Sequence, residues 1–254
     1  MLKNMVVVVT GAVNGLGRQT LAHFCQENAN VFGCDIRDDD GELEKIFGDK
    51  VGFLKADVRK EKDMEQVFKR AKEKFGRLDV LVNCAGYAAS HITLTSGGLP
   101  FKLEHFSRLL EVNVCGQFNA SRLAAKEMAT NDLDEDGSRG VIILTSGFAG
   151  KTARGGQAGI SACCGGIESM TLPMSRDLGS LGIRVATISP GLFSTPLNSS
   201  LSDEVEEFLV RCQSFPHRFG KPVEYSELAL HIVQNKMING DILSIDGGLV
   251  LPTY

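Results

Sequence analysis

The sequence predicts an α/β protein built on one doubly wound, seven-stranded parallel sheet with helices on both faces. Two observations support this prediction. Short apolar runs rich in Val, Ile and Leu alternate with longer amphipathic stretches, and a glycine-rich turn separates the first run from the first such stretch. Strands that alternate with helices build parallel sheets, because each crossover helix returns the chain to the same edge. No repeat or linker interrupts the chain, so we predict a single domain over residues 1–254.

The expected strands are nearly continuous apolar runs, the pattern of strands that are buried on both faces. They cover residues 5–10, 30–35, 51–56, 78–82, 141–144, 183–188 and 241–245. The expected helices have apolar residues at helical spacing and cover residues 16–27, 60–75, 103–128 and 161–181. Residues 131–140 should form a surface loop. Residues 87–101 form a longer Gly-, Ser- and Thr-rich loop, of a length that favours a functional role.

Composition excludes several classes of function. The net charge of −4 gives no indication of electrostatic attraction to nucleic acid or anionic lipid. No apolar run approaches the ~18 residues that span a bilayer, and the first residues show neither a signal-peptide layout nor an Arg-rich transit helix. The seven cysteines are odd in number and lack C-x-x-C spacing, so we expect free thiols in an intracellular protein and no metal site.

A glycine-rich turn follows the first expected strand and opens the first expected helix. Gly11, Gly15 and Gly17 permit a tight turn and let the backbone approach a pyrophosphate, with Asn14 and Leu16 between them. The helix that follows offers free N–H groups and the positive end of its dipole. Glycines also mark ordinary turns, so the position between strand and helix is what makes this motif informative.

Asp35 ends the second expected strand, 18 residues after Gly17. A carboxylate there accepts hydrogen bonds from a ribose 2′-hydroxyl and repels a 2′-phosphate, which favours NAD over NADP. The alternative is a solvated Asp in an acidic turn, because Asp38, Asp39 and Asp40 follow closely.

Together these and further motifs resemble the classical short-chain dehydrogenase/reductase family, whose fold is Rossmann-type. The further matches are Asp57-Val58, Asn83-Cys84-Ala85-Gly86, Asn113-Val114-Cys115-Gly116 and Pro190-Gly191. The resemblance runs from about residue 5 to residue 248. Within the family, the runs 74–80, 170–173 and 190–193 are most similar to mitochondrial dehydrogenases of 3-hydroxyacyl-CoA and hydroxysteroids.

The resemblance implies a role for each matched position. Asn14 and Leu16 would contact the pyrophosphate, within the turn of Gly11, Gly15 and Gly17. The other implied cofactor contacts are Asp35 and Ile36 at the adenosine ribose, Asp57 and Val58 at the adenine, Cys84, Ala85 and Gly86 along the cofactor, and Pro190, Gly191, Phe193 and Thr195 at the nicotinamide end.

The catalytic groups of the family are largely missing. Its members reduce carbonyls with a Ser, a Tyr and a Lys, supported by an Asn. Counted from Gly140 and from Gly165-Gly166-Ile167, the first three positions hold Gly147, Ile160 and Cys164, and only Asn113 remains. Ser146 precedes the Ser position by one residue, so in a strand it should point to the other face.

No displaced copy of the catalytic set occurs elsewhere. None of the tyrosines, Tyr87, Tyr225 and Tyr254, has a Lys four residues later. Tyr87 and His91 lie in the loop beside the expected nicotinamide, and a substitute acid from that loop is the remaining alternative. Neither a basic neighbour nor C-x-x-C spacing activates Cys163 and Cys164, so we expect ordinary thiols rather than a redox switch.

The sequence therefore favours a catalytically impaired family member, a pseudoenzyme that binds NAD, with weakened affinity, as a scaffold, partner subunit or cofactor sensor. The alternative is an NAD-dependent oxidoreductase of 3-hydroxyacyl-CoA or hydroxysteroid-like alcohols with a non-standard proton donor. The resemblance also implies a homotetramer and the mitochondrial matrix; without it, we would expect a cytoplasmic protein.

Overall fold

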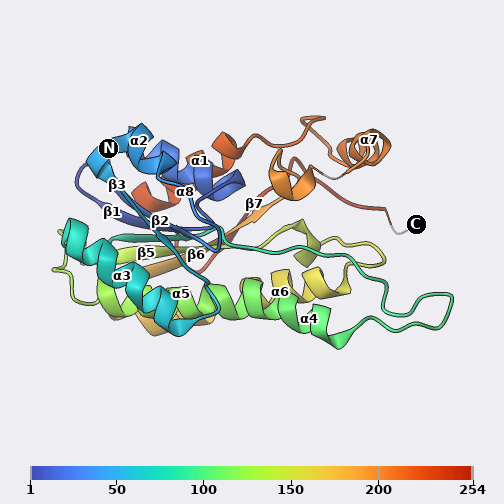
Figure 1. The fold of residues 1–254 in the computed structure, drawn as a ribbon, viewed down its shortest axis with the longest axis horizontal. Coiled ribbons are helices and arrows are strands. Elements are labelled where there is room, and N and C mark those ends of the chain that lie inside the picture. The colour runs from blue at the N-terminus through green and yellow to red at the C-terminus, as the bar shows by residue number, and fades with distance from the viewer. Residues whose placement is uncertain (1, 200, 253–254) are drawn as a thin grey trace.

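All seven strands belong to one parallel sheet in the computed structural model, which describes residues 2–199 and 201–252 (Figure 1). The strand order is β3-β2-β1-β4-β5-β6-β7. The strands are β1 Val6–Thr10, β2 Asn30–Asp35, β3 Val51–Lys55, β4 Val80–Asn83, β5 Gly140–Thr145, β6 Ile183–Pro190 and β7 Ile242–Ile245. The predicted fold class is confirmed, and the seven predicted strands are found with ends shifted by at most two residues.

Helices cover both faces of the sheet (Figure 1). One face carries α1 Gly15–Gln26, α2 Glu42–Phe47 and α8 Pro222–Gln234. The opposite face carries α3 Glu61–Phe75, α4 Leu103–Leu110, α5 Gly116–Met128 and α6 Ala158–Gly179. A π-helical segment, Glu111–Cys115, joins α4 to α5. Helix α7, Asp203–Arg211, lies beyond the carboxyl ends of the strands, and short 3₁₀ turns cover Gly48–Lys50, Phe148–Gly150 and Pro196–Asn198.

Strand β1 shows why the sheet strands are apolar at every position. Val7 and Val9 join the core cluster that includes residues of α1 and α8, whereas Val8 joins the cluster that includes residues of α3, α5 and α6. All three side chains are fully buried. Alternate side chains point to opposite faces of a strand, and here both faces are covered by helices, so the pattern becomes continuous.

The chain reverses its direction of winding at β1. This strand pairs with β2 on one side and β4 on the other, while β3 and β5 continue the sheet outward. In doubly wound sheets, the carboxyl ends of the strands on the two sides of such a reversal leave a crevice where ligands bind. The glycine turn and the residues that follow β2, β3 and β4 all lie at that edge.

Three helices are absent from the sequence prediction: α2, α7 and α8. Helix α8 begins with Pro222, and the Glu224 carboxylate accepts the Lys221 backbone N–H at 2.7 Å. The predicted helix over 103–128 is found as one unbroken helical stretch, in which the π-helical segment separates α4 from α5. Among the described residues, no helix combines the length and the apolar character needed to span a bilayer.

Candidate functional site

The glycine turn packs closely against the backbone that follows β4 and against its own first residue. Gly11 has a φ of +68°, and a Cβ added there would lie 2.7 Å from the Ala85 nitrogen. A Cβ on Gly17 would lie 2.1 Å from the Gly11 carbonyl oxygen. Backbone at these two positions therefore has no room for a side chain, and Gly15, with a φ of +56°, adds a second left-handed residue. Because its glycines have no side chains, the turn leaves the space above it free for a ligand.

The first turn of α1 has uncapped backbone N–H groups. Its N-cap residue Asn14 has an extended backbone and makes no side-chain capping bond, and no acidic side chain lies in the first turn. Free N–H groups and the positive dipole end at such a terminus favour a phosphate group. The residues of the turn therefore fit the pyrophosphate of a dinucleotide.

Asp35 is buried and already engaged by the backbone. Its carboxylate accepts the Val13 N–H at 3.1 Å and the Arg37 N–H at 3.0 Å. Arg37 also places its Nε 3.7 Å from the same carboxylate, while most of its side chain remains exposed. The ion pair between Arg37 and Asp35 is not predicted from the sequence. It partly offsets the negative charge that would repel a 2′-phosphate.

Asp57 forms a similar pair with Arg59 after β3. The guanidinium donates to both carboxylate oxygens, the shortest contact being 2.6 Å from Nη2. These hydrogen bonds from Arg59 hold the pKa of Asp57 below its usual value. The end of the cleft at which the family resemblance places the adenosine therefore presents two Asp–Arg pairs instead of two bare carboxylates.

A cleft of about 440 Å³ joins these elements. It contains most of the predicted cofactor positions: Gly11, Asn14, Gly15, Leu16, Asp35, Ile36, Asp57, Val58, Cys84, Ala85, Gly86 and Thr195. Residues not predicted as cofactor contacts also line it: Arg37, Ala56, Arg59, Tyr87, Arg108, Val112, Pro196 and Leu197. Gly17 lies buried beneath the turn. Pro190, Gly191 and Phe193, at the end of β6 and just after it, are not among the lining residues.

The positions of the missing catalytic groups lie together between β5 and α6. A Cβ added at Gly147 would be 3.4 Å from the Cys164 Sγ and 3.9 Å from the Pro190 carbonyl oxygen. Burial raises the pKa of the Cys164 thiol to about 12. This thiol is therefore neutral at pH 7 and cannot take the place of an ammonium group. Ile160, half-buried on the first turn of α6, has no proton to donate.

Ser146 does not take over the role of the missing Ser. Its Oγ donates to Glu168 Oε1 at 2.9 Å, and Ser189 Oγ donates to the same oxygen at 3.2 Å. Ser146 and Gly147 thus both meet α6, one turn apart, so the expectation that they face opposite sides is wrong. Strand β5 ends at Thr145, and the alternation of a strand no longer holds at these positions.

Asn113 positions the loop after β4. It lies buried in the π-helical segment, where its Nδ2 donates to the Tyr87 carbonyl at 2.7 Å and its Oδ1 accepts the Tyr87 N–H at 3.0 Å. Nδ2 also donates to the Leu109 carbonyl at 2.9 Å. A π-helical bulge is frequent at functional sites, and this one turns an amide toward the cleft loop.

The two candidate substitute acids lie in different surroundings. Tyr87 lines the cleft, with the Arg108 guanidinium 4.9 Å from its ring centroid. His91 instead contacts His105, with 3.3 Å between His105 Nδ1 and His91 Nε2, and is stacked on Phe101. The structure therefore brings Tyr87, and not His91, to the wall of the cleft.

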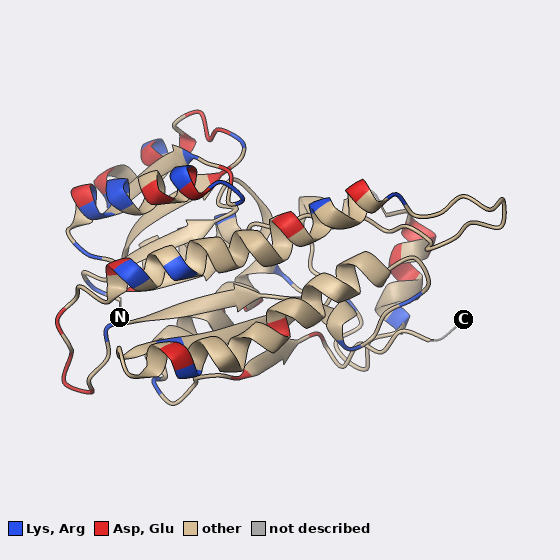
Figure 2. Cartoon of the chain, turned by 90° about the horizontal axis from the view of Figure 1, so that it is seen from below, with Lys and Arg blue, Asp and Glu red and all other residues tan. Residues whose placement is uncertain are grey.

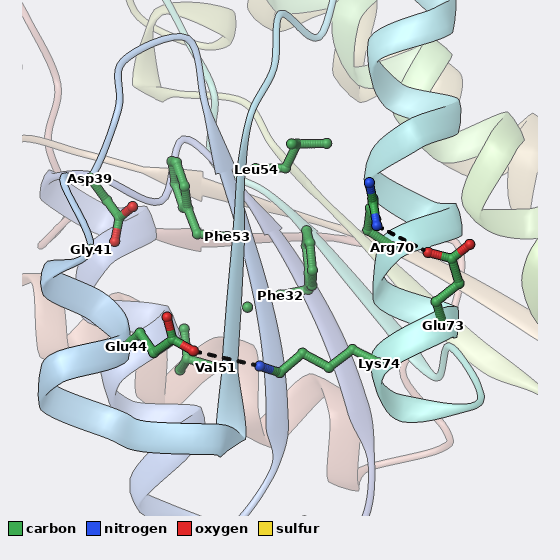
Figure 3. A pocket seen from close by; sticks show the side chains of 11 residues that line it. Phe32, Asp39, Gly41, Glu44, Val51, Phe53, Leu54, Arg70, Glu73 and Lys74 are labelled. Carbon is green, nitrogen blue, oxygen red and sulfur yellow. Dashed lines mark ion pairs between the residues drawn. The ribbon is translucent and has the colours of Figure 1, made fainter.

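A second cavity, of about 590 Å³, lies beside the edge strand β3 (Figure 3). Four of its charged side chains form two ion pairs, Lys74 with Glu44 at 4.0 Å and Arg70 with Glu73 at 3.6 Å. The fifth, Asp39, accepts the Leu43 backbone N–H at 3.0 Å. None of the predicted site residues lines it. The larger volume is therefore not a reason to place the functional site there.

The fold and the cleft define a dinucleotide-binding α/β protein. A family model described as short chain dehydrogenase matches residues 5–206, and the chain belongs to the short-chain dehydrogenase/reductase family. It is 43% identical to the 3-hydroxyacyl-CoA dehydrogenase type-2 of Drosophila melanogaster, over 98% of each chain. It is 44% identical to the enzyme of that name from Homo sapiens, over 98% of this chain and 96% of the other.

Comparison with a solved structure supports the same family fold. The crystal structure of 3-hydroxyacyl-CoA dehydrogenase type-2 from Mycobacterium avium superposes with a TM-score of 0.93 at 27% sequence identity, covering 98% of this chain and 97% of that one. These relatives are dehydrogenases by name. They support the oxidoreductase alternative better than the impaired protein that the sequence analysis favoured, and nothing in them indicates a loss of catalysis.

Proposed function

We propose that the cleft binds NAD or NADH and that the chain is an oxidoreductase. It would oxidise the hydroxyl group of a 3-hydroxyacyl-CoA or hydroxysteroid, or reduce the corresponding ketone. The observation that carries the proposal is the glycine turn beneath the uncapped N-terminus of α1, with Asp35 beside it. The relatives' names supply the 3-hydroxyacyl-CoA substrate class.

The choice of NAD over NADP rests on Asp35, and Arg37 moderates it. The carboxylate favours a free ribose 2′-hydroxyl. The exposed Arg37 side chain lines the same end of the cleft and would attract a 2′-phosphate. We therefore expect NADH to bind more tightly than NADPH, but by a smaller factor than a bare Asp would give.

Reduction of a ketone requires a hydride on the carbonyl carbon and a proton on its oxygen. A bound nicotinamide would supply the hydride. Ile160 has no acidic hydrogen and the Cys164 thiol is buried, so the proton must come from another group. Tyr87 is the candidate that the cleft contains: Asn113 fixes its backbone, and Arg108 lies over its ring. We assign the proton donation to its phenol.

The test is the rate of NADH consumption with a 3-oxoacyl-CoA. Tyr87→Phe removes only the hydroxyl and should lower the rate at least about tenfold, which is less than the ~10²–10⁴-fold that a fully positioned general acid contributes. His91→Gln tests the other loop candidate, and His217→Gln is a matched control on an exposed imidazole elsewhere. Unchanged turnover in a Tyr87→Phe, His91→Gln double variant would sink the assignment of a loop donor.

The catalytic positions favour a second candidate function, cofactor binding without turnover. Gly147, Ile160 and Cys164 provide no hydroxyl, no phenol and no ammonium where family members carry them. A protein of this kind would act as a scaffold, partner subunit or cofactor sensor. Nucleotide binding with no detectable reaction, on both 3-oxoacyl-CoA and ketosteroid substrates, would select this candidate over the oxidoreductase.

The face formed by α5 and α6 supports self-association. Between Ala158 and Ser175, α6 has one charged residue, Glu168, and its carboxylate is held by two Ser hydroxyls. Figure 2 shows this helix almost without charged residues, in contrast to α3. Phe118 and Leu172 are each 46% exposed on these helices. We propose a homo-oligomer, a tetramer by the family resemblance. The mitochondrial matrix is proposed on the same resemblance.

Light scattering of the purified protein tests the oligomer. Leu172→Glu on α6 should lower the molecular mass, because it places a charge on the proposed contact face. Ile46→Glu on α2 is the matched control: it is 60% exposed on the opposite side of the sheet. A monomeric wild-type protein would contradict the proposal.

A further inference from the structure

Two histidines from different segments meet at the base of the loop that follows β4. His91 lies in the loop itself and His105 in the first turn of α4. Their closest ring nitrogens, His91 Nε2 and His105 Nδ1, are 3.3 Å apart, and the ring centroids are 4.9 Å apart with an interplanar angle of 50°. Both residues are half-buried, so each keeps part of its surface in contact with solvent.

This geometry suits a shared metal ion as well as it suits a hydrogen bond. Two imidazole nitrogens bound to one tetrahedral zinc ion, each at about 2.0–2.1 Å, lie about 3.3–3.4 Å apart, and their ring centroids lie about 5 Å apart. Rings that point straight at each other across a hydrogen bond of the same length would have centroids roughly 5.6 Å apart. The observed 4.9 Å means that the rings are inclined to each other rather than collinear.

The position of His91 is fixed before any ligand arrives. Its backbone N–H donates to the Gly156 carbonyl at 2.7 Å, which ties the loop to the segment preceding α6. Its ring is stacked on Phe101, with centroids 4.8 Å apart and a 24° interplanar angle. His105 is held by its backbone N–H, which donates to the Lys102 carbonyl at 3.1 Å. The stacked His91 ring therefore loses little side-chain freedom when it binds an ion.

The pair lies close to the first turn of α6. A Cβ added at Gly159 would lie 3.5 Å from Phe101 Cε1 and 3.6 Å from Phe106 Cδ2. Phe101 is also the ring on which His91 is stacked, and Ile160 is the residue after Gly159. Phe101 therefore connects the His91 imidazole to the segment that carries the altered catalytic position.

We propose that His91 and His105 form a binding site for a divalent transition-metal ion of the zinc, nickel or copper type. Imidazole is a preferred ligand of these ions. In the described part of the chain, no third His, Cys, Asp or Glu side chain completes the set. The ion would keep two or more positions for water or for a ligand oxygen, which is the arrangement of an open site rather than a structural one.

Calorimetric titration of the untagged, chelator-treated protein with nickel chloride tests the proposal. Nickel is the probe because the seven free thiols would compete more strongly for zinc. We expect one equivalent to bind, with affinity reduced at least about tenfold in His91→Gln and in His105→Gln. His217→Gln and His231→Gln remove imidazoles that lie outside the pair and should bind nickel as the wild type does. Thermal melts without metal establish that each variant is folded.

A rise in melting temperature on adding nickel gives an independent readout. It should appear in the wild type and in the His217→Gln control, and vanish in both pair variants, because only an ion bound to the folded state stabilises it. Absence of binding in the wild type would show that the contact is only a hydrogen bond. Binding that survives both pair substitutions would place the ion elsewhere. Either result overturns the proposal, and neither depends on turnover or on the cofactor.

Discussion

Restoring the missing catalytic groups is the sharpest perturbation of this site. The combined variant Gly147→Ser, Ile160→Tyr, Cys164→Lys rebuilds the hydroxyl, the phenol and the ammonium that family members use. The Ser fits: a Cβ at Gly147 has its nearest neighbours 3.4 Å and 3.9 Å away, which is ordinary contact, and the φ of 179° is extended. The Lys is harder, because the burial that raises the pKa of the Cys164 thiol to about 12 also opposes an ammonium. Glu168, one turn later in α6, provides a nearby carboxylate.

The expected gain follows from the ordinary size of each contribution. A positioned general acid adds about 10²–10⁴-fold and an oxyanion donor about 10²–10³-fold, and such groups act as a unit. We therefore expect the triple variant to turn over a 3-oxoacyl-CoA at least about 10²-fold faster than the unmodified chain. Each single variant should gain little. A Lys in contact with the nicotinamide ribose should also tighten NADH binding by about 1–3 kcal/mol, roughly 5- to 150-fold.

NADH consumption measures the rate, and calorimetry measures the binding. The matched control is Gly147→Ser, Ile160→Phe, Cys164→Lys, which differs from the test variant by one phenolic oxygen. The gain in rate should disappear in this control, while the gain in affinity should remain. Equal rates for the unmodified chain and the triple variant would refute the reasoning, because they would mean that an existing donor already performs the proton transfer at full efficiency.

Three other predictions concern charge, packing and reactivity. Arg37→Ala should raise the ratio of NADPH to NADH dissociation constants several-fold, because it removes the cation beside Asp35; parallel titrations measure it. Arg184→Met should lower the free energy of unfolding by about 2–4 kcal/mol, because the buried guanidinium donates to the Ile232, Val233 and Ile238 carbonyls; urea denaturation measures it, with exposed Arg211→Met as the control. The raised pKa of the Cys164 thiol should make its alkylation by iodoacetamide at pH 8 much slower than that of exposed Cys115, and peptide mapping would compare the two. Equal labelling of these cysteines in the folded protein would be inconsistent with the buried position of Cys164.

The strands and the glycine turn could be predicted because their signals are local. A strand buried on both faces must be apolar at every position, and a turn with left-handed residues under a helix must contain glycine. Helices α2 and α7 have only 6 and 9 residues. Short helices depend on tertiary contacts, which no local pattern reports. The π-helical segment coincides with hydrogen bonds between Asn113 and Tyr87, 26 positions apart, and no local sequence pattern reports contacts over that separation.

The candidate site was predicted where the backbone defines it and missed where long side chains complete it. Gly11, Asn14 and Asp35 follow from the strand–turn–helix pattern. Arg37 and Arg59 reach the cleft only because the chain turns after β2 and β3, and Arg108 reaches it from α4. The one signal for the first two was their spacing, since each lies two residues after a predicted Asp contact. Contact between His91 and His105 depends on the path of a long loop, for which the sequence has no periodic pattern.

The central claim is that this chain retains a nicotinamide dinucleotide site although the usual proton donor is absent. Calorimetric titration of the purified protein with NADH and with NADPH tests it most directly, because it requires no substrate. We predict micromolar binding of NADH and weaker binding of NADPH, with both lost when Gly11→Val fills the turn. A folded sample that gives no heat with either nucleotide at millimolar concentration would contradict the account.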